Sequence, residues 1–195
     1  HDSSAALVVD GKVVAAVSEE RFTRIKHDTT FPYKSIDYCL KSQGITFDDI
    51  DVVCFYEKPL LKLERVMQTG KVWQEKGTAS VQDQVSHGLR EGLFLDKVLK
   101  EDYGYTGRIC YTQHHVAHAA SSYYVSGFEE AAIITADGVG EWATTTKSIG
   151  RGSEIELLGE IHYPDSLGLF YSTITAFLGF KVNNDEYKVM GLAPY

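Results

Sequence analysis

Short apolar runs alternate with stretches of helical spacing along most of the chain. Runs rich in β-branched and aromatic residues predict strands, and apolar positions three or four apart predict helices facing a core. Strands are predicted at residues 5–10, 12–18, 51–56, 108–112, 131–136, 142–149 and 154–163. Helices are predicted at 32–44, 60–66, 89–103, 113–127 and 167–180, and a polar turn at 183–187 leads into a short final helix.

Three stretches between these elements have their own character. The Asp10-Gly11 pair predicts a tight hairpin between the first two strands. Residues 19–28 are densely charged and are interpreted as a solvated loop, whose basic residues form a local positive cluster that could meet phosphate. Residues 68–87 are polar with few apolar anchors, so we expect an irregular insertion there.

The order of elements indicates an α/β protein with two similar halves. The first half reads hairpin, helix, strand, helix, strand, helix, and the second begins as strand, glycine turn, hairpin, helix. The two share a plan if one strand precedes His1. Two lobes, each a mixed sheet flanked by helices, make up the architecture of actin, sugar kinases and Hsp70. This architecture is the actin-like ATPase fold, which is ribonuclease H-like. We expect a first lobe at 1–128 and the start of a second at 129–195.

Composition narrows the class of protein. The 195 residues are 44% hydrophobic and 24% charged, as in an ordinary globular protein. The net charge of −8 argues against nucleic-acid or anionic-membrane partners. The sequence contains neither a membrane-spanning apolar run nor a signal peptide. Cys39, Cys54 and Cys110 are scattered and odd in number, which favours reduced, buried thiols in a cytoplasmic protein.

Three histidines at the predicted strand–helix junction after residue 112 are the first candidates for chemistry. His114 and His118 are four residues apart, so on a helix they share a face and can point at one atom. Imidazole is the commonest protein ligand for borderline metals, and two on one turn pre-organise a site. The alternative is that His114, His115 and His118 are surface or core residues without a ligand. The pattern favours a metal site for iron, zinc or manganese.

Asp137 follows the predicted strand 131–136 and is the nearest acidic candidate for the same metal. A carboxylate at the carboxyl end of a strand is where α/β sheets bind ligands. Gly138 and Gly140 let backbone N–H groups approach an anion, which predicts a phosphate contact. The alternative is an ordinary Asp-Gly turn.

Five motifs span nearly the whole chain: HDSSAALVVDG, SEERFTRIKHD, QHHVAHAAS, ADGVGEWATT and DEYKVMGLAPY. Together they resemble one enzyme family, the NodU/TobZ-type O-carbamoyltransferases, and match the amino-terminal domain of that family. This domain is related to HypF and to the tRNA threonylcarbamoyladenosine-synthase subunit.

The resemblance implies an actin-like ATPase fold, a bound iron or zinc, and ATP as co-substrate. It implies that carbamoyl phosphate and ATP give carbamoyl-adenylate, whose carbamoyl group passes to a hydroxyl of a sugar, an antibiotic or a similar small molecule. The family's metal ligands fall on His114, His118 and Asp137, with a further carboxylate expected beyond Tyr195. The YrdC-like domain that makes the adenylate is also expected outside this sequence. We therefore expect a fragment of a longer protein, inactive alone.

Other residues are candidates for roles around the phosphates. His1, Asp2 and Ser3 form the turn expected to face them, and His1 could carry a proton. Lys188 is either a phosphate or carboxylate partner or a solvated lysine at a helix start. Glu141 either orients the acceptor, binds a second metal, or is an ordinary glutamate at a strand edge.

Two other function classes compete with the carbamoyltransferase. An actin-like small-molecule kinase or ATPase would use an aspartate base and magnesium, and would not need the His114/His118 pair. A non-enzymatic, nucleotide-responsive module would have no turnover to lose on substitution of His118.

Overall fold

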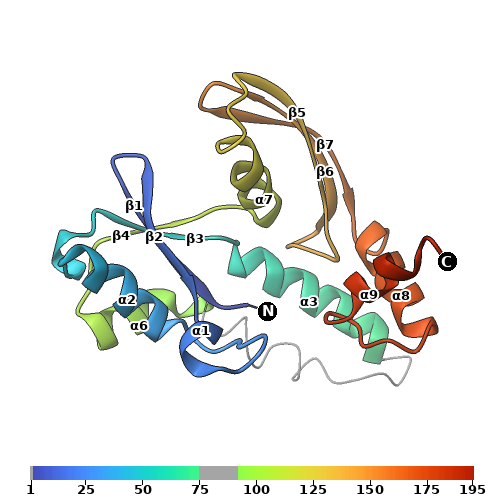
Figure 1. Cartoon of the computed structure of the whole chain (residues 1–195), viewed down its shortest axis with the longest axis horizontal. Coiled ribbons are helices and arrows are strands. Elements are labelled where there is room, and N and C mark those ends of the chain that lie inside the picture. Colours follow the sequence, from blue (N-terminus) through green and yellow to red (C-terminus); the bar gives the residue numbers. More distant parts are fainter. Residues whose placement is uncertain (1, 75–91) are drawn as a thin grey trace. The chain divides into compact units, whose positions relative to one another are not determined.

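The computed structural model describes residues 2–74 and 92–195, and it is a mixed α/β structure with three small sheets (Figure 1). The chain divides into two compact units. One comprises His1–Phe55 and Val66–Cys110, and the other comprises Tyr56–Arg65 and Tyr111–Tyr195. Residues 111–128 belong to the second of these compact units, and the lobe boundaries at 128 and 129 stay a prediction.

A hairpin opens the first unit. Strands β1 (Ser4–Val9) and β2 (Lys12–Ser18) pair antiparallel, and helix α2 (Tyr33–Gln43) packs against both. Asp10 and Gly11 have φ of 49° and 74°, the left-handed conformations of the predicted tight turn. The hairpin prediction is confirmed.

The core of the first unit lies under a second pair of strands. Strands β3 (Val52–Phe55) and β4 (Arg108–Tyr111) form this sheet, and helix α6 (Leu95–Tyr103) contributes Leu95 and Leu99 to the core. Phe31 and Tyr105 complete the buried cluster. A short 3-10 helix, η1 (Phe47–Asp49), precedes β3.

One prediction in this region needs correction. Helix α3 spans Pro59–Gln74, so residues 68–74 are helical rather than part of an irregular insertion. Residues 75–87 of that predicted insertion lie outside the described residues. The same holds for residues 89–91 of the helix predicted at 89–103.

The charged stretch 19–28 is only partly a solvated loop. It contains a short helix, α1 (Glu20–Thr23), and Glu19 before it is 2% exposed. The Glu19 carboxylate accepts hydrogen bonds from the Ser35 N–H and hydroxyl, at 2.8 and 2.7 Å, and from the Lys34 N–H at 3.1 Å. These donors lie in the first turn of α2, where no intrahelical acceptor exists, so the buried charge stabilises the start of that helix.

The second unit is a three-stranded antiparallel sheet with a helix on one face (Figure 1). Its strands are β5 (Glu130–Ala136), β6 (Ala143–Arg151) and β7 (Glu154–His162), and helix α7 (His114–Tyr123) packs on them. Ala119 and Tyr123 of α7 and Ile133 of β5 form the buried cluster. The packing of Tyr123 requires glycine at position 150, because a Cβ added to Gly150 would lie 2.6 Å from the Tyr123 ring.

Helix α8 (Leu167–Phe177) is less buried than the sequence predicts. Phe170 and Phe177 are 66% and 84% exposed, and Thr175 is the buried residue of the helix. Apolar residues on several sides predicted a helix packed on the sheet, but among the described residues α8 contacts mainly helix α9 (Glu186–Leu192) and β6.

The three cysteines are free thiols, as predicted, although only Cys39 is buried and Cys54 is exposed. Among the helices that the structure describes, none is both long and apolar enough to cross a membrane.

Replacing Glu19 by alanine should destabilise the first unit, because the Ser35 donors would stay buried without an acceptor. We expect the free energy of unfolding to fall by about 3 kcal/mol. Chemical denaturation measures this change. Glu101→Ala is the control, since that exposed side chain forms a surface ion pair with Lys97 one helical turn away, and it should cost less than about 0.5 kcal/mol. Equal effects of the two substitutions would contradict the role of Glu19.

Candidate metal centre

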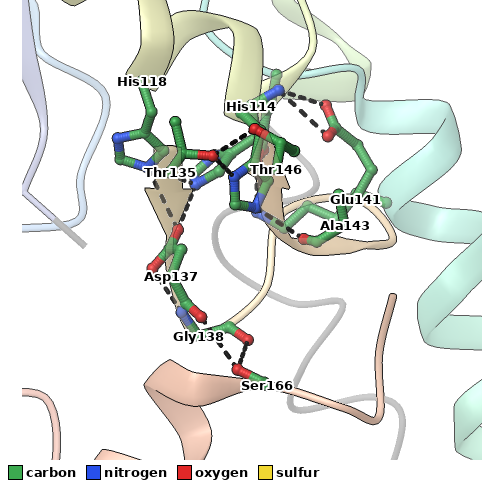
Figure 2. A network of polar contacts seen from close by, with 12 residues as sticks. His114, His118, Thr135, Asp137, Gly138, Glu141, Ala143, Thr146 and Ser166 are labelled. Atoms are coloured by element: carbon green, nitrogen blue, oxygen red, sulfur yellow. Dashed lines mark hydrogen bonds and ion pairs between the residues drawn. The ribbon is translucent and has the colours of Figure 1, made fainter. Parts of the chain in front are cut away.

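Helix α7 and the end of β5 bring together the three residues that the sequence proposed as metal ligands. His114 is the first residue of α7, and His118 lies one turn later on the same face. Asp137 follows β5 directly. In Figure 2 the two imidazoles descend from the helix toward the Asp137 carboxylate. The three residues form the one metal-ligand cluster found among the described residues.

The donor atoms of the cluster converge on one point. The Nε2 atoms of His114 and His118 are 3.0 Å apart. The Oδ2 atom of Asp137 lies 2.6 Å from the first and 3.3 Å from the second. Bonds of about 2.1 Å to a single ion place neighbouring ligand atoms about 3 Å apart, so the spacing fits a transition metal. The side chains of His118 and Asp137 are 50% and 36% exposed, which leaves room for further ligands.

The Asp137 carboxyl is held in its charged form. The hydrogen bond from His114 lowers its pKa far below the usual range, and the N–H of Gly138, 2.6 Å from Oδ1, acts in the same direction against the effect of burial. An ionised carboxylate is the form that ligates a metal, so Asp137 is ready to do so without losing a proton.

Glu141 holds the beginning of α7. Its carboxylate is 5% exposed, and its Oε1 atom accepts from the backbone N–H of His114 at 3.0 Å and of Lys58 at 2.8 Å. A negative charge is favourable at the positive end of a helix and satisfies an N–H that has no intrahelical acceptor. Figure 2 shows this contact beside the first ligand histidine. Glu141 therefore fixes the backbone from which His114 projects.

The loop after Asp137 packs closely on both sides. A Cβ on Gly140 would lie 3.0 Å from the Cβ of His114, so glycine permits the close approach. The backbone N–H groups of Gly138 and Gly140 donate to Asp137 Oδ1 and to the Ala143 carbonyl oxygen. In the described structure both N–H groups are thus engaged within the chain, and their predicted phosphate contact stays a prediction.

Ser166 joins this loop to α8. Its hydroxyl lies 3.0 and 2.7 Å from the carbonyl oxygens of Asp137 and Gly138, and its Oγ accepts from the Leu169 N–H at the start of α8. A serine immediately before a helix is a capping signal, so this role of Ser166 could have been predicted from the sequence. The bonds to the loop depend on tertiary structure.

The remaining predicted residues are not members of the donor cluster. Asp2 pairs with His27 at 2.8 Å, and the backbone of Ser3 bonds with that of Glu19 and Asp28; these residues belong to the first unit. Lys188 forms an ion pair with Asp185 at 2.8 Å, at the start of α9. His1 lies outside the described residues. The roles of these residues at phosphates stay predictions.

Known proteins are similar to this chain over its full length. Residues 1–195 match the family model described as carbamoyltransferase N-terminus. An uncharacterized protein of Synechocystis sp. is 48% identical over 203 residues, covering 100% of this chain and 33% of that protein. The nodulation protein NolNO of Sinorhizobium fredii is 39% identical over 201 residues, covering 100% of this chain and 28% of that protein.

A third relative is less similar in sequence. An uncharacterized protein of Methanocaldococcus jannaschii is 30% identical over 195 residues, covering 100% of this chain and 32% of that protein. The chain thus spans about a third of the length of these relatives.

Replacing Gly168 by alanine should disturb the junction of α8 with Asp137. The added Cβ would lie 2.4 Å from the backbone carbon and oxygen of Asp137, and backbone atoms cannot rotate away. We expect a loss of about 3 kcal/mol in unfolding free energy, the upper range for overpacking. Thermal and chemical denaturation measure it.

Gly191→Ala is the matched control for this substitution. Gly191 is also a helical glycine, in α9, and an added Cβ there has no neighbour within 4 Å. Alanine at that position should be neutral or stabilise by up to about 1 kcal/mol. A Gly168→Ala protein as stable as the Gly191→Ala protein would show that the close approach at Asp137 is not required.

Proposed function

Because the chain belongs to the carbamoyltransferase N-terminus family over its whole length, we propose that the complete protein is an ATP-dependent O-carbamoyltransferase. It transfers a carbamoyl group from carbamoyl phosphate, by way of carbamoyl-adenylate, to a hydroxyl of a sugar, an antibiotic or a similar small molecule. The observation that carries the proposal is the convergence of His114, His118 and Asp137 within 4.8 Å, in a chain of this family.

The proposed centre takes iron or zinc on these three residues. Two imidazoles and one carboxylate suit such borderline metals, whereas a magnesium-dependent kinase would have no use for the imidazoles. When bound, the metal supplies Lewis-acid polarisation of a carbamoyl or phosphoryl oxygen. The kinase and the non-enzymatic module are therefore less well supported than the transferase.

The residues of this chain have separate tasks in the proposed reaction. Asp137 contributes a negative charge at the donor cluster, because its pKa keeps it ionised. Glu141 holds the backbone of His114, and Ser166 holds the backbone of Asp137, so both sides of the cluster are fixed before a substrate arrives. Pre-positioned groups need no rearrangement when charge develops, which is how electrostatic stabilisation becomes effective.

The fold proposal has support from the order of elements. We propose that the two units are parts of the two ribonuclease H-like lobes of an actin-like ATPase. The hairpin β1–β2 is followed by helix α2, and the meander β5–β6–β7 is followed by helix α8. The proposal further includes a YrdC-like domain elsewhere in the complete protein and a cytoplasmic location, without nucleic-acid or membrane partners.

Product analysis tests the proposed reaction directly. The complete protein, given carbamoyl phosphate, ATP and a panel of hydroxylated acceptors, should yield a carbamoyl-adenylate or a carbamoylated acceptor detectable by mass spectrometry. Phosphorylated acceptors without any carbamoyl product would instead identify a kinase and overturn the proposal.

Substitution of a ligand tests the metal centre. His118→Ala and Asp137→Asn should each lower bound iron or zinc by about tenfold or more and abolish carbamoyl transfer, because two ligands do not retain the ion. Elemental analysis and product formation measure the two effects. His162→Ala is the control, since that exposed histidine is outside the donor cluster and pairs with Glu160 on β7. Full metal content in the His118→Ala protein would contradict the assignment.

A further inference from the structure

The third histidine of α7 is buried beside the proposed metal ligands, with its ring centroid 5.6 Å from that of His114 and 5.9 Å from that of His118. His115 is 4% exposed and both of its ring nitrogens are hydrogen-bonded. Nδ1 lies 2.6 Å from the hydroxyl oxygen of Thr135, and Nε2 lies 2.9 Å from the carbonyl oxygen of Ala143. The hydroxyl oxygens of Thr135 and Thr146 are also 2.6 Å apart, and both threonines are buried.

The chemistry of the partners sets the direction of every bond in this chain. A carbonyl oxygen can only accept, so Nε2 of His115 carries the proton and donates to Ala143. In the neutral ring Nδ1 then accepts from the Thr135 hydroxyl. Thr135 has used its only proton, so its oxygen accepts from the hydroxyl of Thr146. His115, Thr135, Thr146 and the Ala143 carbonyl therefore form one continuous, satisfied network, of which Figure 2 labels Thr135, Ala143 and Thr146.

The network joins the elements that carry the proposed ligands. His115 lies between His114 and His118 on α7. Thr135 precedes Asp137 by two residues, so the two positions lie on the same side of the β5 segment. Thr146 lies directly opposite Thr135 in the register of β5 and β6. A shift or rotation of α7 against β5 would break the bonds of His115.

Apolar packing does not provide this restraint by itself. The buried apolar cluster of α7 involves Ala119 and Tyr123, in the second half of the helix, whereas both ligand histidines lie in the first half. Hydrophobic contact is non-directional and tolerates small sliding movements. Hydrogen bonds depend on distance and angle, and a metal site requires ligand positions correct within about 0.5 Å.

We propose that His115, acting with Thr135 and Thr146, is a positioning residue that sets the separation between the His114/His118 pair and Asp137. This inference rests on the metal centre of the proposed function. Both ring nitrogens of His115 are engaged within the chain, and its role is to hold the helix that carries two of the residues that would bind the metal.

Removal of one hydroxyl tests the inference in the complete protein. Thr135→Val has nearly the same shape, but it leaves Nδ1 of His115 without a donor and frees the helix to shift. We expect the affinity for Co²⁺, measured by competition with a chelator, to fall by about 10- to 100-fold, the usual effect of losing a group that orients a metal ligand. The visible absorption bands of the Co²⁺-loaded protein should also change.

Two further threonine variants make the comparison specific. Thr145→Val removes a buried hydroxyl from the neighbouring position of β6, and that hydroxyl has no hydrogen-bond partner in the described part of the chain. Its Co²⁺ affinity and spectrum should match those of the unsubstituted protein. Thr135→Ser restores the hydroxyl and should return the affinity to within about threefold of the original.

A second site protects the test against misfolding. If the Thr135→Val protein is unfolded by circular dichroism, Thr146→Val removes the outer hydroxyl alone and should weaken Co²⁺ binding by about tenfold. A folded Thr135→Val or Thr146→Val protein with unchanged affinity and spectrum would overturn the inference, as would an equal loss in Thr145→Val. Failure of the unsubstituted protein to bind Co²⁺ would overturn the metal centre itself, and the inference with it.

Discussion

The contact between α7 and strands β5 and β6 is the interaction on which the candidate centre depends. One side of this contact is apolar and buries Ala119, Tyr123 and Ile133. Burial of such side chains is worth about 1.5–3 kcal/mol for each large residue, so it stabilises the layer as a whole. The other side is polar and includes His115, Thr135 and Thr146. The apolar contact stabilises the packing of the helix on the sheet, and the polar contact fixes the position of α7 relative to β5.

Glu141 and Asp137 both contact His114, but they differ in burial and therefore in role. Glu141 is enclosed, and one of its oxygens is engaged by two backbone N–H groups, so it acts on the start of α7. Asp137 is more open, and its Oδ2 atom faces the two imidazoles. Both carboxylates are linked to His114, one through its backbone and the other through its ring. Their different surroundings explain why one residue supports the centre and the other is a candidate ligand.

Local patterns predicted most elements well. The hairpin turn at Asp10 and Gly11, the strands of the second unit and the helix with His114 and His118 all follow from periodicity and turn residues. Errors occurred where local pattern and tertiary environment disagree. Glu19 belongs to a charged run, yet it is buried because the donors at the start of α2 face it. Among the described residues, the apolar helix α8 is largely exposed and contacts mainly α9 and β6.

By itself, the sequence determined which residue types could form a centre: two imidazoles at helical spacing and a carboxylate at the end of a strand. The helical spacing and the strand end follow from the side-chain periods of helices and strands, 3.6 and 2 residues, which are local properties of the backbone. Only the tertiary structure decided that these residues meet, that His115 faces inward, and that Glu141 and Ser166 hold the adjoining backbone. Such contacts join residues distant in the chain, and their geometry depends on packing that no local period encodes.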